Sequence, residues 1–130
     1  MTSDKKRAAP AGSPPDTVPG RTPVAVSWSA AATAYAVSAW FAGDTSTVMQ
    51  VIATALVLVA VAGVPLLLAV GDRRSVLLAA IAGAIGVFLW ILPLLVPGFG
   101  AAPWEPWAFM AALLHGLTAR LAAFALRRAR

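Results

Sequence analysis

Residues 47–96 read TVMQVIATALVLVAVAGVPLLLAVGDRRSVLLAAIAGAIGVFLWILPLLV, which is two apolar runs separated by the charged tetrapeptide 71–74. Each run is as long as the roughly 20 residues that an α-helix needs to cross the hydrocarbon core of a bilayer. A short connection containing Asp and two Arg places the ends of both runs in water, because charge is costly in hydrocarbon. The stretch therefore predicts a transmembrane helical hairpin.

Two further apolar runs flank this hairpin. We predict spans at residues 24–42, 47–70, 76–96 and 107–126, in an all-α polytopic membrane protein whose four helices form an up-down antiparallel bundle. The composition agrees, with 60% hydrophobic and 12% charged residues, whereas charged residues make up about a quarter of an ordinary soluble domain. In 130 residues the four spans leave room only for a tail and short loops.

The distribution of basic residues predicts the orientation of the chain. In order along the sequence they are Lys5, Lys6, Arg7, Arg21, Arg73, Arg74, Arg120, Arg127, Arg128 and Arg130. They precede the first run, separate the second from the third and close the fourth, while the other two connections hold none. This is the positive-inside pattern of a protein with both termini in the cytoplasm. We expect the net charge of +5 to meet anionic lipid headgroups and not nucleic acid.

The two ends of the chain are polar. Residues 1–23 carry half of the ten prolines and predict a disordered cytoplasmic tail, and residues 127–130 form a basic cytoplasmic C-terminus. A cleaved signal peptide is the alternative for the first span, but its apolar stretch exceeds the usual roughly 7 to 15 residues and contains Trp28, Tyr35 and Trp40. The residue bias is typical of a GC-rich bacterial genome, so we expect a bacterial cell-membrane protein.

The positions of aromatic residues and of one helix cap support these predicted spans and their orientation. Trp40, Phe41, Phe99, Trp104 and Trp107 cluster near the predicted outer interface and Trp28 lies near the inner one, where amphipathic indoles prefer to sit. In the inner connection Asp72 is a solvated charge that helps to start the third span, with Ser75 as the expected helix cap.

Two side chains in the fourth span are candidates for an intramembrane polar site. His115 is predicted near mid-bilayer, where we expect a neutral imidazole hydrogen bonded across helices to Thr33, Ser38 or Thr54. A proton relay is the alternative, although it requires a partner acid that no span core contains. Arg120 is expected to extend its side chain to the headgroups, or alternatively to contact an anion or lipid headgroup together with Arg127.

The outer connection offers a candidate docking surface at Trp104, Glu105 and Trp107. Aromatic side chains and prolines bracket one carboxylate, which could receive a cationic group or a partner subunit. The preferred interpretation is a helix anchor, because a carboxylate favours the N-terminal end of the helix that follows.

Small residues recur at four-residue spacing in the third and fourth spans, and the helix-packing candidates are Gly83, Gly86, Ala112 and Gly116. Such spacing lets helix backbones approach closely in lipid. We expect packing between these two spans, with a dimer or partner face as the alternative.

The chain lacks the residues that an enzyme of a known type would need. It has no cysteine, no Ser-His-Asp set, no paired carboxylates and no phosphate loop, so we expect no enzyme, no cofactor and no metal.

We expect a non-catalytic accessory or assembly subunit that packs against a larger membrane complex or against itself. The alternatives are a small oligomeric transporter or channel, with at most a proton path through His115, and a holin-like pore former. Small multidrug-resistance transporters share the length and the four spans, but residues 24–42 lack the acid which that family carries in its first span.

Overall fold

The computed structural model describes residues 17–41, 47–96 and 105–129, and every regular element within them is an α-helix. The helices are α2 (Arg21–Phe41), α3 (Thr47–Ala69), α4 (Arg73–Leu95) and α5 (Pro106–Arg128). Each is long and apolar enough to cross a membrane. The prediction of an all-helical protein with four helices of membrane-spanning length is therefore confirmed.

The helix boundaries agree with the predicted spans to within three residues, and one difference changes the assignment of the tail. Helix α2 begins at Arg21 because Pro23 lies in its first turn, where the missing N–H of proline is tolerated. Val18 is also buried, and its N–H donates to the Gly71 carbonyl at 2.7 Å. The predicted tail boundary at residue 23 is thus too late in the chain, and residues 1–16 lie outside the described residues.

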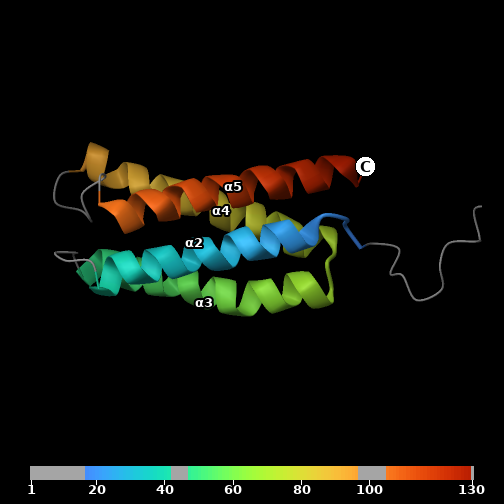
Figure 1. The fold of residues 1–130 in the computed structure, drawn as a ribbon, viewed down its shortest axis with the longest axis horizontal. Coiled ribbons are helices and arrows are strands. Elements are labelled where there is room, and N and C mark those ends of the chain that lie inside the picture. The colour runs from blue at the N-terminus through green and yellow to red at the C-terminus, as the bar shows by residue number, and fades with distance from the viewer. Residues whose placement is uncertain (1–16, 42–46, 97–104, 130) are drawn as a thin grey trace, which may run out of the picture.

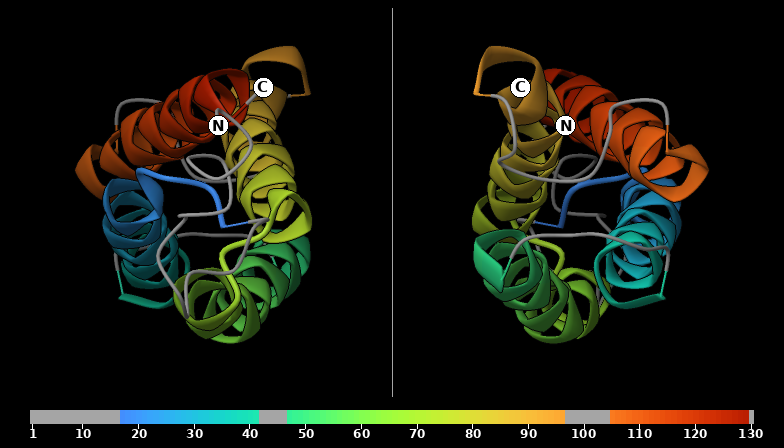
Figure 2. Two further views of the ribbon diagram at one scale, coloured as in Figure 1. Left: turned by 90° about the vertical axis from the view of Figure 1, so that its right-hand side faces the viewer. Right: turned by 90° about the vertical axis from the view of Figure 1, so that its left-hand side faces the viewer.

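The four helices lie side by side along one direction (Figure 1). Viewed from either end, they surround a common axis in the order α5, α2, α3, α4 (Figure 2). Helix α5 has large contacts with both α2 and α4, and α2 also packs against α3, whereas the contact between α3 and α4 is smaller. The last helix of the chain therefore holds the first and third together.

A tight turn joins α3 to α4. Gly71 has a φ of +63°, a left-handed conformation that glycine adopts without steric cost. The Asp72 carboxylate then accepts hydrogen bonds from the Ser75 backbone N–H at 3.0 Å and from the Ser75 hydroxyl at 2.9 Å. Asp72 is therefore the cap of α4, and the expectation that Ser75 fills this role is wrong. A carboxylate just before the helix reaches the free N–H groups of its first turn.

Trp28 fills the core between α2 and α3. It is 1% exposed, and its ring lies against Gly63 of α3, so closely that any side chain at that position would overlap the indole. The prediction that Trp28 sits at a membrane interface is wrong. A residue without a side chain on α3 leaves room for the large ring to enter the bundle.

The arginines near the helix termini gather at one end of the bundle. The Arg21 side chain packs over Gly71, which brings the start of α2 to the α3–α4 turn. Arg73 and Arg74 line a shallow groove together with Leu126, which brings the end of α5 to the same place. The three sequence segments that the charge pattern predicts on one side of the membrane thus lie together in the fold.

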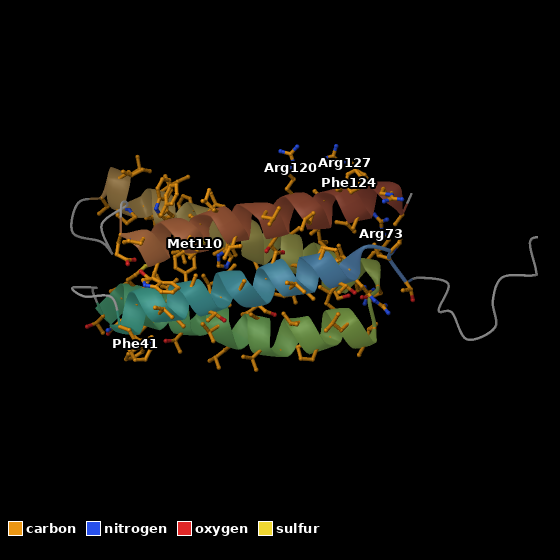
Figure 3. The ribbon with its side chains drawn as sticks, in the orientation of Figure 1. Phe41, Arg73, Met110, Arg120, Phe124 and Arg127 are labelled. Atoms are coloured by element: carbon orange, nitrogen blue, oxygen red, sulfur yellow. The ribbon has the colours of Figure 1, made fainter. Side chains whose placement is uncertain are left out.

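Exposed aromatic side chains lie at the other end. Trp40 and Phe41 end α2, and Trp107 lies in the first turn of α5; all three are exposed. Figure 3 shows Phe41 at the end of the bundle remote from Arg73. Phe99 and Trp104, the other aromatic residues predicted at this interface, lie outside the described residues.

Candidate functional site

Polar side chains join α2 and α5 at several levels of their interface. Near the basic end, the buried Thr118 hydroxyl donates to the Ser27 hydroxyl oxygen at 2.9 Å. Near the aromatic end, the Ser38 hydroxyl donates to the Glu105 carboxylate at 2.8 Å. We call this set the α2–α5 polar seam, and Tyr35 and His115 form its central level.

His115 lies at the centre of the polar seam and is 1% exposed. Its Nδ1 is 2.8 Å from the Ala111 carbonyl oxygen, one turn earlier on α5. Because a carbonyl only accepts, Nδ1 carries a proton in this contact. Nε2 is buried and has no hydrogen-bond partner within the described part of the chain.

The predicted hydrogen bond between His115 and a hydroxyl on another helix is not formed. Thr33 and Thr54 each donate to a backbone carbonyl four residues earlier on their own helix, at 2.8 and 2.7 Å. Ser38 donates to Glu105 instead. Serine and threonine commonly bond back to their own helix in this way, which removes the donors that the prediction required.

Tyr35 occupies the position beside His115. It is fully buried, its ring centroid is 4.9 Å from that of His115, and its hydroxyl donates to the Gly86 carbonyl of α4. One side chain of α2 therefore contacts both α4 and α5. Tyr35 is not among the site residues predicted from the sequence, although a signal exists: Ser27, Tyr35 and Ser38 recur at spacings that place them on one helix face.

The glycines of α4 allow close contact with α5. Gly86 lies against the His115 ring, and a Cβ built at Gly83 would be 2.6 Å from the His115 carbonyl oxygen and 2.8 Å from the Ala119 amide nitrogen. Gly116 of α5 has more space, because a Cβ there would meet only Val87, at 3.6 Å. Ala112, the fourth packing candidate, is buried on α5.

Glu105 starts α5. Its carboxylate accepts from the backbone N–H groups of Trp107 at 3.1 Å and Ala108 at 2.7 Å, in addition to the Ser38 hydroxyl. These bonds use the carboxylate within the fold, as the helix-anchor interpretation requires. Trp107 is 48% exposed beside it, whereas Trp104, the third residue of the candidate docking surface, lies outside the described residues.

Arg120 lies apart from the polar seam, on the outer face of α5. It is exposed and lines a shallow groove with Leu117, Leu121, Phe124 and Arg127. Figure 3 shows the Arg120 and Arg127 side chains extending to the same side, away from the other helices. The two candidates for one intramembrane polar site are therefore separate, because His115 faces the interior and Arg120 faces outward.

Hydrogen bonds within the fold use the hydroxyls and the carboxylate of the seam. Within the described ranges, no group of three or more His, Cys, Asp or Glu side chains could hold a metal ion. The seam hydroxyls and Glu105 bond to each other or to the backbone. No family model, curated protein or solved structure matches this chain.

Proposed function

We propose that this chain is a non-catalytic integral membrane protein that acts as an accessory or assembly subunit of a membrane complex. In this proposal its helices form an up-down antiparallel bundle in the cell membrane, with both termini in the cytoplasm. The observation that supports it best is the use of the interior polar groups. Ser27, Thr118, Ser38 and Glu105 hold α2 and α5 together instead of lining a path through the bundle.

The orientation is supported by the clustering of arginines at one end. A bilayer separates two aqueous phases, and Lys and Arg accumulate in short loops on the cytoplasmic side. Asp72 neutralises only part of the local charge of Arg73 and Arg74, so this end also favours contact with an anionic leaflet, where each basic residue contributes about 1 kcal/mol.

The surface that we propose for a partner helix is a groove between α2 and α3. Its α2 side consists of small or hydroxyl-bearing residues, Ser29, Ala32, Thr33 and Ala36, and its α3 side includes Val57, Ala60, Val61, Val64 and Pro65. Helices associate in lipid through close packing of small residues, because lipid chains are as apolar as the side chains. A groove of this composition on the outer surface suits a transmembrane helix of another subunit or of a second copy.

Gentle extraction of the tagged chain from its native membrane, followed by native mass spectrometry, tests the proposal. We expect a stoichiometric complex that Thr33→Leu disrupts, because the larger side chain fills the groove. Ala84→Leu, at an exposed position on α4, is the matched control and should leave the complex intact. Recovery of only the monomer from both the unmodified chain and the control would contradict the proposal.

A small transporter or channel is the alternative, and the unpartnered Nε2 of His115 is the observation that favours it. Vesicles containing the purified chain and a pH gradient distinguish the two functions. We expect the gradient to decay no faster than in empty vesicles. Faster decay that His115→Phe abolishes would favour a proton path. Faster decay that the substitution leaves unchanged would favour a holin-like pore.

A further inference from the structure

We propose that the outer groove of α5 binds the phosphate group of an anionic membrane phospholipid, held between Arg120 and Arg127. This inference requires the chain to lie in a bilayer, but it does not depend on any partner subunit. It rests on the depth of Arg120, on the absence of a nearby carboxylate within the described residues, and on the shape of the surface around the groove.

Arg120 lies deep for a basic residue. It precedes Arg128, the last residue of α5, by eight positions, which is about 12 Å along a helix that rises 1.5 Å per residue. An extended arginine side chain covers little more than half of that distance, so the Arg120 guanidinium stays on the bilayer side of Arg128, below the level of the helix end. An anionic group that neutralises Arg120 therefore has to lie deeper in the bilayer than the end of α5.

The described part of the chain supplies no such anion. Its acids are Asp72 and Glu105. Glu105 starts the same helix, about 22 Å from Arg120 along the axis, and Asp72 is bonded to Ser75 beside Arg74. An arginine without a partner inside the hydrocarbon is costly, so an external partner of negative charge is favoured.

The second cation of the site is Arg127. It follows Arg120 by seven residues, almost two full helical turns, so both side chains lie on one face (Figure 3). A phosphate between them would receive parallel N–H donors from planar guanidinium groups, the geometry for which arginine is better suited than lysine. Arg128 contacts the Phe124 ring instead, with its guanidinium carbon 5.5 Å from the ring centroid.

The groove walls favour a lipid over a helix of a partner protein. Leu117, Leu121 and Phe124 line the groove, and Leu117 and Phe124 are exposed. Bulky apolar side chains hold a neighbouring helix away but pack well against an acyl chain. The small residues that allow close helix contact lie on other faces, toward α4 and in the α2–α3 groove. An acidic residue on a partner helix is therefore the less favoured source of negative charge.

Native mass spectrometry of the full chain in detergent, with phosphatidylglycerol or phosphatidylcholine added, tests the proposal. We expect retention of phosphatidylglycerol and weak retention of phosphatidylcholine. Arg120→Gln should weaken phosphatidylglycerol binding about tenfold, which corresponds to about 1.4 kcal/mol. Arg120→Lys keeps the charge but loses the planar donors. Its affinity for phosphatidylglycerol should therefore lie between that of the unmodified chain and that of Arg120→Gln. Inorganic phosphate in excess should not displace the lipid, because it cannot fill the apolar part of the groove.

Arg73→Gln is the matched control, since it removes the same charge from an exposed position at the same end of the bundle but in a different groove. Thermal unfolding should show that all variants fold, because both side chains are exposed. Equal loss of phosphatidylglycerol in Arg73→Gln and Arg120→Gln would overturn the proposal in favour of diffuse charge attraction. Unchanged lipid retention in Arg120→Gln would also overturn it, and simultaneous loss of a co-purifying protein would identify an acidic partner helix instead.

Discussion

Single side chains determine how closely the helices approach. Gly83 and Gly86 bring α4 against the backbone and the imidazole of α5, and Gly63 makes room for the Trp28 ring. Tyr35 and His115 then fill the space between α2, α4 and α5. In each case a residue with no side chain faces a large or rigid neighbour, so the contact depends on that one position.

Gly83→Ala should destabilise the bundle by about 1 to 3 kcal/mol, because the new methyl group meets backbone atoms of α5 that cannot rotate away. Thermal unfolding of the purified protein in detergent measures the change. Gly116→Ala is the control within the partner helix. It introduces the same methyl group in ordinary van der Waals contact with Val87, at 3.6 Å, and should be neutral or stabilising by up to about 1 kcal/mol, through better helix propensity. Equal destabilisation by both substitutions would contradict the packing described here.

The hydrogen bond between Ser27 and Thr118 can be isolated by a double-mutant cycle with Ser27→Ala and Thr118→Val. We expect a coupling energy of about 0.6 kcal/mol, and at most about 1.7 kcal/mol, because side-chain hydrogen bonds between membrane helices are modest. Ser29→Ala with Thr118→Val provides the comparison, since Ser29 bonds to its own helix, and should give no coupling. A coupling of zero in both cycles would mean that the two hydroxyls do not interact.

At the scale of the helix, carboxylates define where α4 and α5 begin. Asp72 precedes α4 and Glu105 precedes α5, and each accepts backbone N–H groups of the first turn. Glu105 also binds Ser38, so the start of α5 is fixed to the end of α2. One acid thus sets both a helix boundary and a contact between helices.

Asp72 should make the stability of the bundle depend on pH in the acid range. Hydrogen bonds from the backbone N–H and hydroxyl of Ser75 hold the pKa of Asp72 below its usual value of 3.8. The ionised carboxylate therefore stabilises the fold above the unfolded pKa, and this contribution is lost as the pH falls through the lower folded pKa. Thermal unfolding of Asp72→Asn should consequently show a smaller loss of Tm between about pH 5 and pH 3 than the unmodified chain. Identical pH profiles would show that Asp72 does not cap α4.

The helices were predictable from the sequence, whereas the seam between α2 and α5 was not. Span length and hydropathy are local properties, and charged or Gly- and Pro-containing connections mark their ends. Which face of α2 meets α5 depends on the packing of the whole bundle. For that reason Trp28 was misplaced at an interface and His115 was assigned hydroxyl partners, whereas its ring lies between Tyr35 and Gly86.

At the scale of the whole molecule, the fold separates two kinds of surface. The arginines at the helix termini lie at one end, and the exposed Trp40, Phe41 and Trp107 lie at the other, about one helix length apart. A helix of 23 residues is about 35 Å long, close to the thickness of the bilayer core with part of its interfaces. This asymmetry leads us to propose one orientation in the membrane, with the basic end in the cytoplasm.

Labelling of single cysteines with a membrane-impermeant maleimide in intact cells tests this orientation most directly, because the chain contains no cysteine of its own. Thr45→Cys and Ala101→Cys, in the two connections without basic residues, should react in intact cells. Thr2→Cys, Val70→Cys and Ala129→Cys should react only after the membrane is permeabilised. Labelling of Ala129→Cys or Val70→Cys in intact cells, at the level seen for Thr45→Cys, would contradict the four-span arrangement with both termini in the cytoplasm.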